Sequence, residues 1–397
     1  MSQLTDLSPP PRILMGPGPS DVDPRVLRAL SAPLLGHLDP AFLEIMNEVM
    51  ELLRHVFRTG NRVTFPVSGT GSAGMETVLV NLLEPGDRAV VGVNGLFGQR
   101  MADIAGRCGA EVIVVEAAWG DVIAPEAVEE ALERSGGPVK LVAVVHAETS
   151  TGALQPIEPL AEVAHRAGAL LVVDCVTSLG GCEVAVDAWD VDAAYSGTQK
   201  CLSCPPGLAP VTLNRRAEEI LRARRHPVQS WYLDLTMITS YWGQERFYHH
   251  TAPISMMYAL REALRLILEE GLDNRLRRHR LASAALVAGL EAMGLEAHVP
   301  VARRLPTLTA VKIPAGADDA GTRRALLREF GIEIGGGLGP LKGKIWRIGT
   351  MGYSCQRKNV FLLLTALESV LSRQGLPVGP GAGPAAAAVA YAAGGEA

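Results

Sequence analysis

The sequence has few of the features that mark secreted, membrane or nucleic-acid-binding proteins. Its six cysteines are spread from Cys108 to Cys355, so we expect reduced thiols in a cytoplasm, not a disulfide framework. Apolar runs are broken before they reach the roughly 18 residues of a bilayer span, and the first residues show no secretory signal pattern. A net charge of −5 argues against nucleic acid or an anionic membrane as the main partner.

Short apolar runs alternate with segments of helical spacing through much of the chain. The predicted strands are 63–67, 89–93, 112–116, 141–146, 170–176, 191–195 and 209–213. Most are separated by predicted helices, at 75–83, 98–107, 125–134 and 158–167. Because the strands are apolar on both faces, the pattern predicts an α/β fold with a mainly parallel seven-stranded sheet between layers of helices.

The chain divides into four predicted parts. Residues 1–20 form an N-terminal arm that contains the turn Gly16-Pro17-Gly18-Pro19, and residues 21–270 form a large domain. A helical stretch over 255–294 carries the joint to a smaller α+β domain, residues 271–376. Residues 377–397 are almost entirely Gly, Pro and Ala, so we expect a flexible tail there.

A glycine-rich turn, SGTGSAG over 68–74, lies between a predicted strand and a predicted helix. Amides at a helix start, with the hydroxyls of Thr70 and Ser72, suit a phosphate. The glycines also fit the G-x-G-x-x-G pattern of dinucleotide-binding folds, but the next strand ends in Asn94-Gly95 where such folds need an acid. The turn favours a phosphate cradle, and a plain turn or an NAD-dependent oxidoreductase stays open.

Two ionisable residues lie at or after the ends of later predicted strands. Asp174 ends the apolar run LLVVD, at the sheet edge where open α/β folds bind ligands, although an acid there can also cap a turn. Lys200 lies among small and apolar residues in GTQKCLSCPPG, where burial would lower its pKa and make it a nucleophile. A surface lysine is the plainer alternative. With the phosphate cradle, these residues supply what a pyridoxal phosphate site needs: a carboxylate for the ring nitrogen and an amine for the aldehyde.

The chain resembles the class V aminotransferases of fold-type I, and among them the alanine–glyoxylate and serine–glyoxylate (serine–pyruvate) aminotransferases. The resemblance runs from about Gly16 to Leu371. The blocks that carry it are LMGPGPS, NGLFGQR, AETSTGALQP, VVDCVTSLGG, SGTQKCLSCPPG, YHHTAP, GIEIGGGLGP and RIGTMG. It implies ping-pong transfer of an amino group from alanine or serine to glyoxylate, with pyridoxal phosphate as cofactor.

The resemblance also implies roles for single residues. Lys200 forms the Schiff base and acts as general base, Asp174 pairs with the pyridine nitrogen, and Arg347 clamps the substrate carboxylate. The residues expected to hold the phosphate are Thr70, Gly71, Ser72 and Gln199.

Further implied contacts surround the cofactor ring. Phe97 stacks on one face, Val176 packs on the other, and Thr149 bonds on the side of the ring hydroxyl, beside the substrate. Tyr248 and Thr251 reach the phosphate of a neighbouring subunit, which implies a homodimer.

Several other functions are also consistent with the sequence. The chain also resembles the (S)-ureidoglycine–glyoxylate aminotransferases, through CLS after the lysine and KIWRIGTMGYSC. Tyr248 in place of Asn, the loop Gly337-Leu338-Gly339-Pro340 and the lack of an insertion before Tyr232 favour the alanine/serine type. A broader class V enzyme that uses serine, alanine or aspartate as donor with pyruvate or glyoxylate as acceptor is a further alternative. A non-catalytic binding protein on this scaffold would be expected to lack Lys200 or Asp174.

Two cysteines and two histidines lie close enough in sequence to suggest metal binding or redox chemistry. Cys201 and Cys204 lack a second pair at zinc spacing, so we expect inert thiols, and His249 and His250 are expected to bond locally. Cys355 suggests a cysteine desulfurase, which uses a mobile thiol in this region, but its GTMGYS context matches the aminotransferases.

Overall fold

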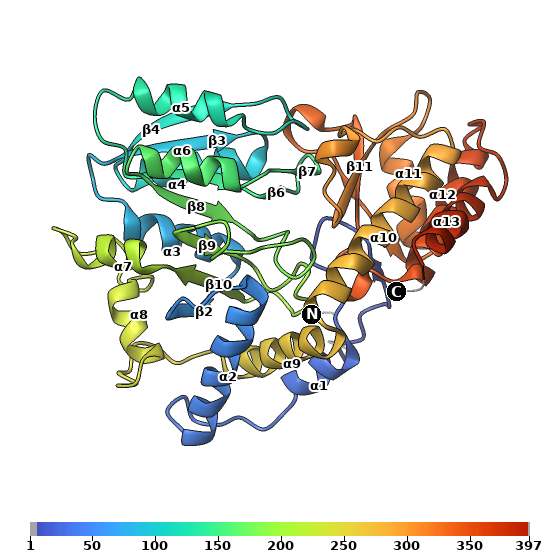
Figure 1. The fold of residues 1–397 in the computed structure, drawn as a ribbon. Helices are drawn as coiled ribbons and strands as arrows, with labels where there is room; N and C mark the ends of the chain where they lie inside the picture. The colour runs from blue at the N-terminus through green and yellow to red at the C-terminus, as the bar shows by residue number, and fades with distance from the viewer. Residues whose placement is uncertain (1–5, 396–397) are drawn as a thin grey trace, which may run out of the picture.

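The computed structural model describes residues 6–395 and contains the predicted sheet (Figure 1). Its strand order is β2-β10-β9-β8-β5-β3-β4. The strands are β2 (Val63–Ser68), β3 (Arg88–Val93), β4 (Glu111–Glu116), β5 (Leu141–Val145), β8 (Leu170–Asp174), β9 (Ala193–Tyr195) and β10 (Leu208–Leu213). β10 runs opposite to the other six strands of this sheet, which are parallel to one another, so the prediction of a mainly parallel seven-stranded sheet is confirmed.

Register brings the polar strand ends together. Asp174 pairs with Val145 of β5 and with Tyr195 of β9, so these three residues share one edge of the sheet. Parallel strands make this edge a natural binding site, because their carboxyl ends and the helix starts that follow converge there.

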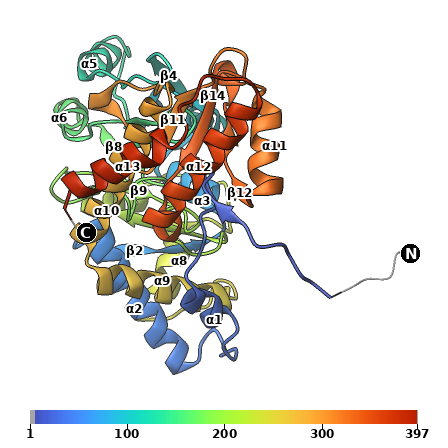
Figure 2. The same cartoon turned by 90° about the vertical axis from the view of Figure 1, so that its right-hand side faces the viewer.

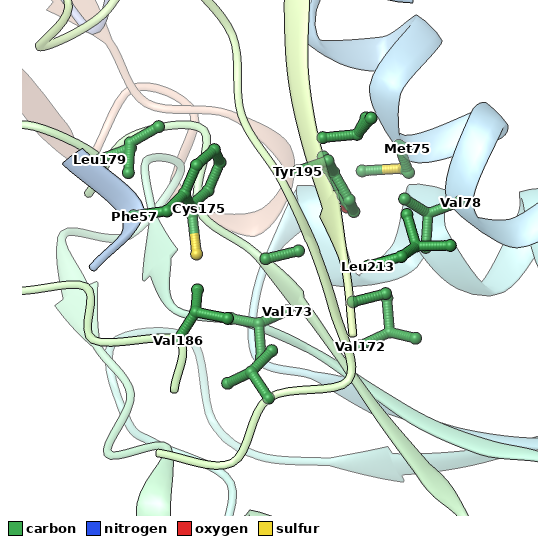
Figure 3. Close-up of a cluster of buried hydrophobic side chains, with 14 of the residues drawn as sticks. Phe57, Met75, Val78, Val172, Val173, Cys175, Leu179, Val186, Tyr195 and Leu213 are labelled. Atoms are coloured by element: carbon green, nitrogen blue, oxygen red, sulfur yellow. The ribbon is translucent and has the colours of Figure 1, made fainter. Parts of the chain in front are cut away.

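Helices cover both faces of the sheet. They are α2 (Pro40–Phe57), α3 (Gly71–Leu82), α4 (Leu96–Arg107), α5 (Pro125–Glu133), α6 (Glu158–Arg166), α7 (Arg215–Arg222), α8 (Leu235–Trp242) and α9 (Ile254–Glu270). Figure 3 shows the two-sided core, with Phe57 and Val186 on one side of β8 and β9 and Met75 and Val78 on the other. Burial on both faces explains why these strands read as continuous apolar runs.

The second part of the chain packs around a smaller sheet of order β11-β14-β13 (Figure 1). Its elements are α10 (Leu272–Ala292), β11 (Leu308–Lys312), α11 (Asp319–Glu329), β12 (Ile332–Glu333), β13 (Gly335–Gly336), β14 (Ile345–Gly349) and α12 (Arg357–Arg373). The helical stretch predicted over 255–294 is two helices, because Gly271 takes a φ of 81° between α9 and α10. The domain boundary at residue 270 stays a prediction.

Short elements complete the chain. Near the N-terminus lie β1 (Ile13–Leu14) and α1 (Pro24–Leu30), and a small hairpin joins β6 (Ala147–Glu148) to β7 (Ala153–Leu154). Three single-turn helices cover Val301–Arg303, Gly339–Leu341 and Gly352–Ser354. In the described range, no helix combines the length and the apolar character needed to cross a membrane.

The expectation of a flexible tail over 377–397 is wrong for most of that segment. Helix α13 (Ala382–Ala393) packs against α10 and α12, with Ala387 and Tyr391 buried (Figure 2). The carboxylate of Glu368 accepts hydrogen bonds from the amides of Gly381 (3.0 Å) and Gly383 (2.7 Å), and so caps the helix from another element. Alanine has high helix propensity, and a distant carboxylate at the helix start stabilises it further.

Candidate active site

The glycine-rich turn forms the N-terminus of α3. The residue before the helix, Thr70, makes no side-chain hydrogen bond to the first turn, so its hydroxyl is available to a ligand. A Cβ on Gly71 would lie 3.2 Å from a methyl group of Val176 and 3.5 Å from the Cα of Gly197. A side chain at position 71 would therefore crowd a space that backbone amides now border.

Gln199 adds a polar end to this turn. Its Oε1 is buried and has no hydrogen-bond partner among the described residues, and a Cβ on Gly197 would lie 2.9 Å from it. Oε1 can only accept a hydrogen bond, so a bound anion would bond to the NH₂ of the Gln199 amide, and a half-turn of the amide exchanges these two ends. The open helix start, the Thr70 hydroxyl and this amide together fit a phosphate.

Asp174 is buried at the carboxyl end of β8. One carboxylate oxygen accepts from the amide of Val176 (2.8 Å) and the other from the hydroxyl of Tyr195 (2.9 Å). Burial raises the pKa of Asp174 to about 6, and the two hydrogen bonds oppose that rise. The sequence reasoning missed Tyr195, although it is the last residue of the strand next to Asp174.

Lys200 is also buried, in the loop that follows β9. Burial lowers the pKa of Lys200 to about 8, with the nearby charge of Arg347 acting in the same direction and that of Asp174 against it. Its ammonium group donates to the carbonyl of Pro17, in the N-terminal arm. An amine with this pKa is partly neutral near pH 7–8, as a nucleophile and general base must be.

Arg347 enters from β14 and is held by backbone carbonyls on both sides. Nε donates to the carbonyl of Gly336 (2.7 Å) and Nη1 to that of Thr149 (3.1 Å). Burial lowers the pKa of Arg347 to about 10, which leaves it a cation at neutral pH. Its orientation is therefore fixed before any carboxylate binds.

A buried acid that sequence reasoning did not single out shapes the start of α4. Glu148 accepts from the amides of Phe97 (3.1 Å) and Gly98 (3.4 Å) and from the amide of Ser150 (3.0 Å). It thereby sets the position of Phe97. The signal for Glu148 in the sequence was its position just after the predicted strand 141–146.

Arg100, one turn further along α4, was also missed. Its guanidinium lies 5.0 Å from the ring centroid of Phe97, and Nη1 donates to the hydroxyl of Ser72 (3.2 Å). Arg100 brings a cation to the edge of the cradle, where a phosphate would gain from it.

Most of the predicted residues line one cavity of about 140 Å³. They are Thr70, Gly71, Ser72, Phe97, Thr149, Asp174, Val176, Gln199 and Lys200. Arg347 is outside this lining but contacts Thr149 and acts on the charge of Lys200. Tyr248 and Thr251 are exposed and are not among the residues that line the cavity, so their role toward a neighbouring subunit stays a prediction.

The cysteines and histidines considered for other chemistry are buried or make local hydrogen bonds. Cys355 is buried, and burial raises its pKa to about 11, which does not suit a mobile thiolate nucleophile. Cys201 and Cys204 are buried as well. His249 and His250 bond to each other (2.7 Å), and His250 bonds to Ser68 (2.7 Å), as local contacts were expected.

Comparison with known proteins identifies the family. Residues 21–342 match the family aminotransferase class V. The structure of ureidoglycine–glyoxylate aminotransferase from Bacillus subtilis superposes with a TM-score of 0.95 at 47% identity, covering 98% of this chain and 100% of that one. An alanine–glyoxylate aminotransferase from Nostoc sp. gives a TM-score of 0.91 at 51% identity over 93% and 97%. The alanine–glyoxylate aminotransferase of Callithrix jacchus is 43% identical over 93% of this chain and 89% of its own.

These matches set aside the NAD-dependent oxidoreductase that the glycine pattern left open. They agree with the polar groups at the sheet edge. The start of α3 suits a phosphate, Asp174 suits a ring nitrogen, and Lys200 suits an aldehyde. The chain belongs to the class V aminotransferases, whose cofactor is pyridoxal phosphate.

Proposed function

We propose that this aminotransferase moves the amino group of alanine or serine to glyoxylate, giving glycine and pyruvate or hydroxypyruvate. The observation that supports it is a buried amine, Lys200, on which the charges of a buried acid, Asp174, and of a fixed guanidinium, Arg347, both act. The similarity to alanine–glyoxylate aminotransferases supports the choice of substrates.

Each residue has a defined task in this proposal. Pyridoxal phosphate, when bound, supplies a ring that withdraws electrons from the amino acid. Asp174, as a carboxylate, would hold the proton on the ring nitrogen. Lys200 would take the α-proton of the substrate with its lone pair and deliver it to the carbon that was the aldehyde carbon of the cofactor. Thr70, Gly71, Ser72 and Gln199 would bind the phosphate.

Arg347 decides which end of the substrate enters. Its guanidinium is held on two carbonyls, and its position near Lys200 places a substrate carboxylate beside the base. Because the donor and the acceptor carry the same carboxylate, one arginine serves both half-reactions.

The active unit would be a homodimer. Tyr248 and the neighbouring Thr251 are exposed in the single chain and lie in a segment that also exposes Phe247. Exposed aromatic side chains of this kind are common at subunit interfaces. In a dimer they would complete the phosphate site of the partner.

An (S)-ureidoglycine–glyoxylate aminotransferase is the second candidate. The Bacillus subtilis enzyme of that activity is as similar to this chain as the alanine–glyoxylate enzymes are. Tyr248 and the Gly337–Pro340 loop support the first proposal over this one.

A panel of donors separates the two. Alanine, serine, aspartate and ureidoglycine would each be supplied with glyoxylate or pyruvate, and glycine or alanine formation measured. We expect alanine or serine with glyoxylate to give the highest kcat/KM. Turnover confined to ureidoglycine would overturn the proposal in favour of the second candidate.

Two variants test the roles. Lys200→Ala should abolish turnover, and appreciable activity in it would refute the assignment of the base. Arg347→Lys keeps the charge and loses the paired hydrogen bonds, so KM should rise roughly tenfold for both the donor and glyoxylate. A rise for only one of them would contradict a shared clamp.

A further inference from the structure

The N-terminal turn Gly16-Pro17-Gly18-Pro19 has a place in the site that the proposed function does not use. We define the strap as Met15–Ser20. At its first end, β1 pairs in parallel with β12, the amide of Met15 donates to the carbonyl of Glu333 (2.9 Å), and the amide of Gly349 donates to the carbonyl of Met15 (2.8 Å). The strap is therefore bound to β14, the strand that carries Arg347.

At its other end the strap is bound to the lysine loop. The amide of Ser20 donates to the carbonyl of Gln199 (2.8 Å), and its hydroxyl donates to the carbonyl of Lys200 (2.8 Å). The strap thus connects the strand of the carboxylate clamp to the loop of the base, and its middle passes beside the amine.

Contacts at the middle are close. The carbonyl of Pro17 accepts the hydrogen bond from Nζ of Lys200. A Cβ on Gly18 would lie 2.6 Å from Cδ and 2.7 Å from Nζ of Lys200, and Gly18 has a φ of 105°. A Cβ on Gly335, across the strap, would lie 2.6 Å from the Cδ of Pro17. Glycine on both sides lets the backbone approach the lysine this closely.

The hydrogen bond to Pro17 restricts the direction of the lone pair on Lys200. A neutral lysine amine has two N–H groups and one lone pair, and only the lone pair accepts the α-proton. When one N–H donates to a fixed carbonyl, the lone pair is confined to the two remaining staggered positions on the nitrogen. The same carbonyl also accepts from the ammonium formed after proton transfer, so it serves the base in both protonation states.

We propose that the carbonyl of Pro17 positions Lys200 as the general base, and that Gly18 keeps open the space in which the lysine side chain moves. This rests on the proposed function, in which Lys200 transfers the α-proton. Pro17 and Gly18 are positioning residues, because they act through the lysine and not on the substrate.

The test begins with Gly18→Ala in the full-length protein freed of cofactor. Carbamylation of Lys200 by cyanate, followed by peptide mass spectrometry across pH, gives the pH midpoint at which the amine becomes neutral. Displacing the lysine from Pro17 removes an acceptor that favours the ammonium, so the midpoint should fall by about one pH unit. Gly16→Ala is the matched control, because its Cβ would have only ordinary contacts, the nearest at 3.6 Å, and its midpoint should match that of the wild type.

Gly335→Ala displaces the strap from the opposite side. Its methyl group would push on Pro17 without touching Lys200, and position 335 has no positive φ. Gly335→Ala should also lower the pH midpoint of Lys200 carbamylation. If Gly18→Ala fails to fold, this second variant tests the proposal by itself. In the loaded enzyme both variants should lose roughly tenfold or more in kcat, with KM for the donor nearly unchanged, because Arg347 still binds the carboxylate.

Unchanged midpoints in folded variants would overturn the proposal, and so would a lower kcat with an unchanged midpoint, since that pattern indicates a purely structural strap. Failure of the proposed function is distinguishable. If the wild type transfers no amino group from any donor of the panel, that function is wrong, whereas the midpoints measured without cofactor still judge the strap.

Discussion

The hydrogen bond from Tyr195 to Asp174 leads to a sharp prediction. Tyr195 is fully buried at the end of β9, and its hydroxyl lies 2.9 Å from one carboxylate oxygen (Figure 3 shows its ring in the core). Tyr195→Phe removes the hydroxyl and keeps the ring. A hydrogen bond to a charged group contributes about 1.5–3 kcal/mol, and one pH unit of pKa corresponds to about 1.4 kcal/mol. The pKa of Asp174 should therefore rise by about one to two pH units in the variant.

The consequence for activity follows from the starting value. Because the pKa of Asp174 is already raised to about 6, a further rise protonates much of it at pH 7, and a neutral acid cannot hold the charge of a ring nitrogen. We expect kcat/KM at pH 7 to fall roughly two- to tenfold and to recover toward pH 9, with the acidic limb of the profile moved to higher pH.

Stability of the cofactor-free protein offers a second readout. The folded protein holds the Asp174 proton at a pH where the unfolded chain has lost it, so its stability falls as pH rises from about 4 through the folded pKa. The variant should be less stable than the wild type at pH 8 and much closer to it at pH 5, where Asp174 is largely protonated in both.

Tyr258→Phe is the matched control. Tyr258 is also buried, but its hydroxyl bonds to the carbonyl of Pro33 and to no acid, so this change should leave the acidic limb in place. An acidic limb that stays at the wild-type pH in Tyr195→Phe would refute the idea that Tyr195 keeps Asp174 ionised.

Two further predictions concern the cradle and the C-terminal helix. Gly71→Ala should weaken pyridoxal phosphate binding roughly tenfold or more in a fluorescence titration, because the added methyl would crowd Val176 and Gly197; Gly106→Ala, with its nearest neighbour at 4.0 Å, is the control, and equal affinities would contradict the cradle. Tyr391→Ser should cost about 2–4 kcal/mol in denaturant unfolding, whereas Val389→Ser, at an exposed position of α13, should cost little; equal effects would mean that α13 does not pack.

Local sequence patterns were sufficient for the framework. Valine-rich strands and helical spacing predicted each strand of the large sheet to within two residues, because both-face burial repeats along the chain. The same local patterns located the glycine turn, Asp174 and Lys200, since each lies at or just after the end of a recognisable strand. The assignments to the phosphate, the ring faces and the substrate came from the resemblance to a family.

Contacts between distant segments decided the rest. Tyr195 reaches Asp174 through strand pairing, Glu148 fixes Phe97 from another strand, and Pro17 meets Lys200 across 183 positions of sequence. No periodicity announces such pairs, because a hydrogen bond between remote segments depends on how the layers pack. The C-terminal segment shows the same limit. Its alanine-rich sequence alone predicts a flexible tail, whereas in the structure Glu368 caps the start of α13 and α10 packs against this helix.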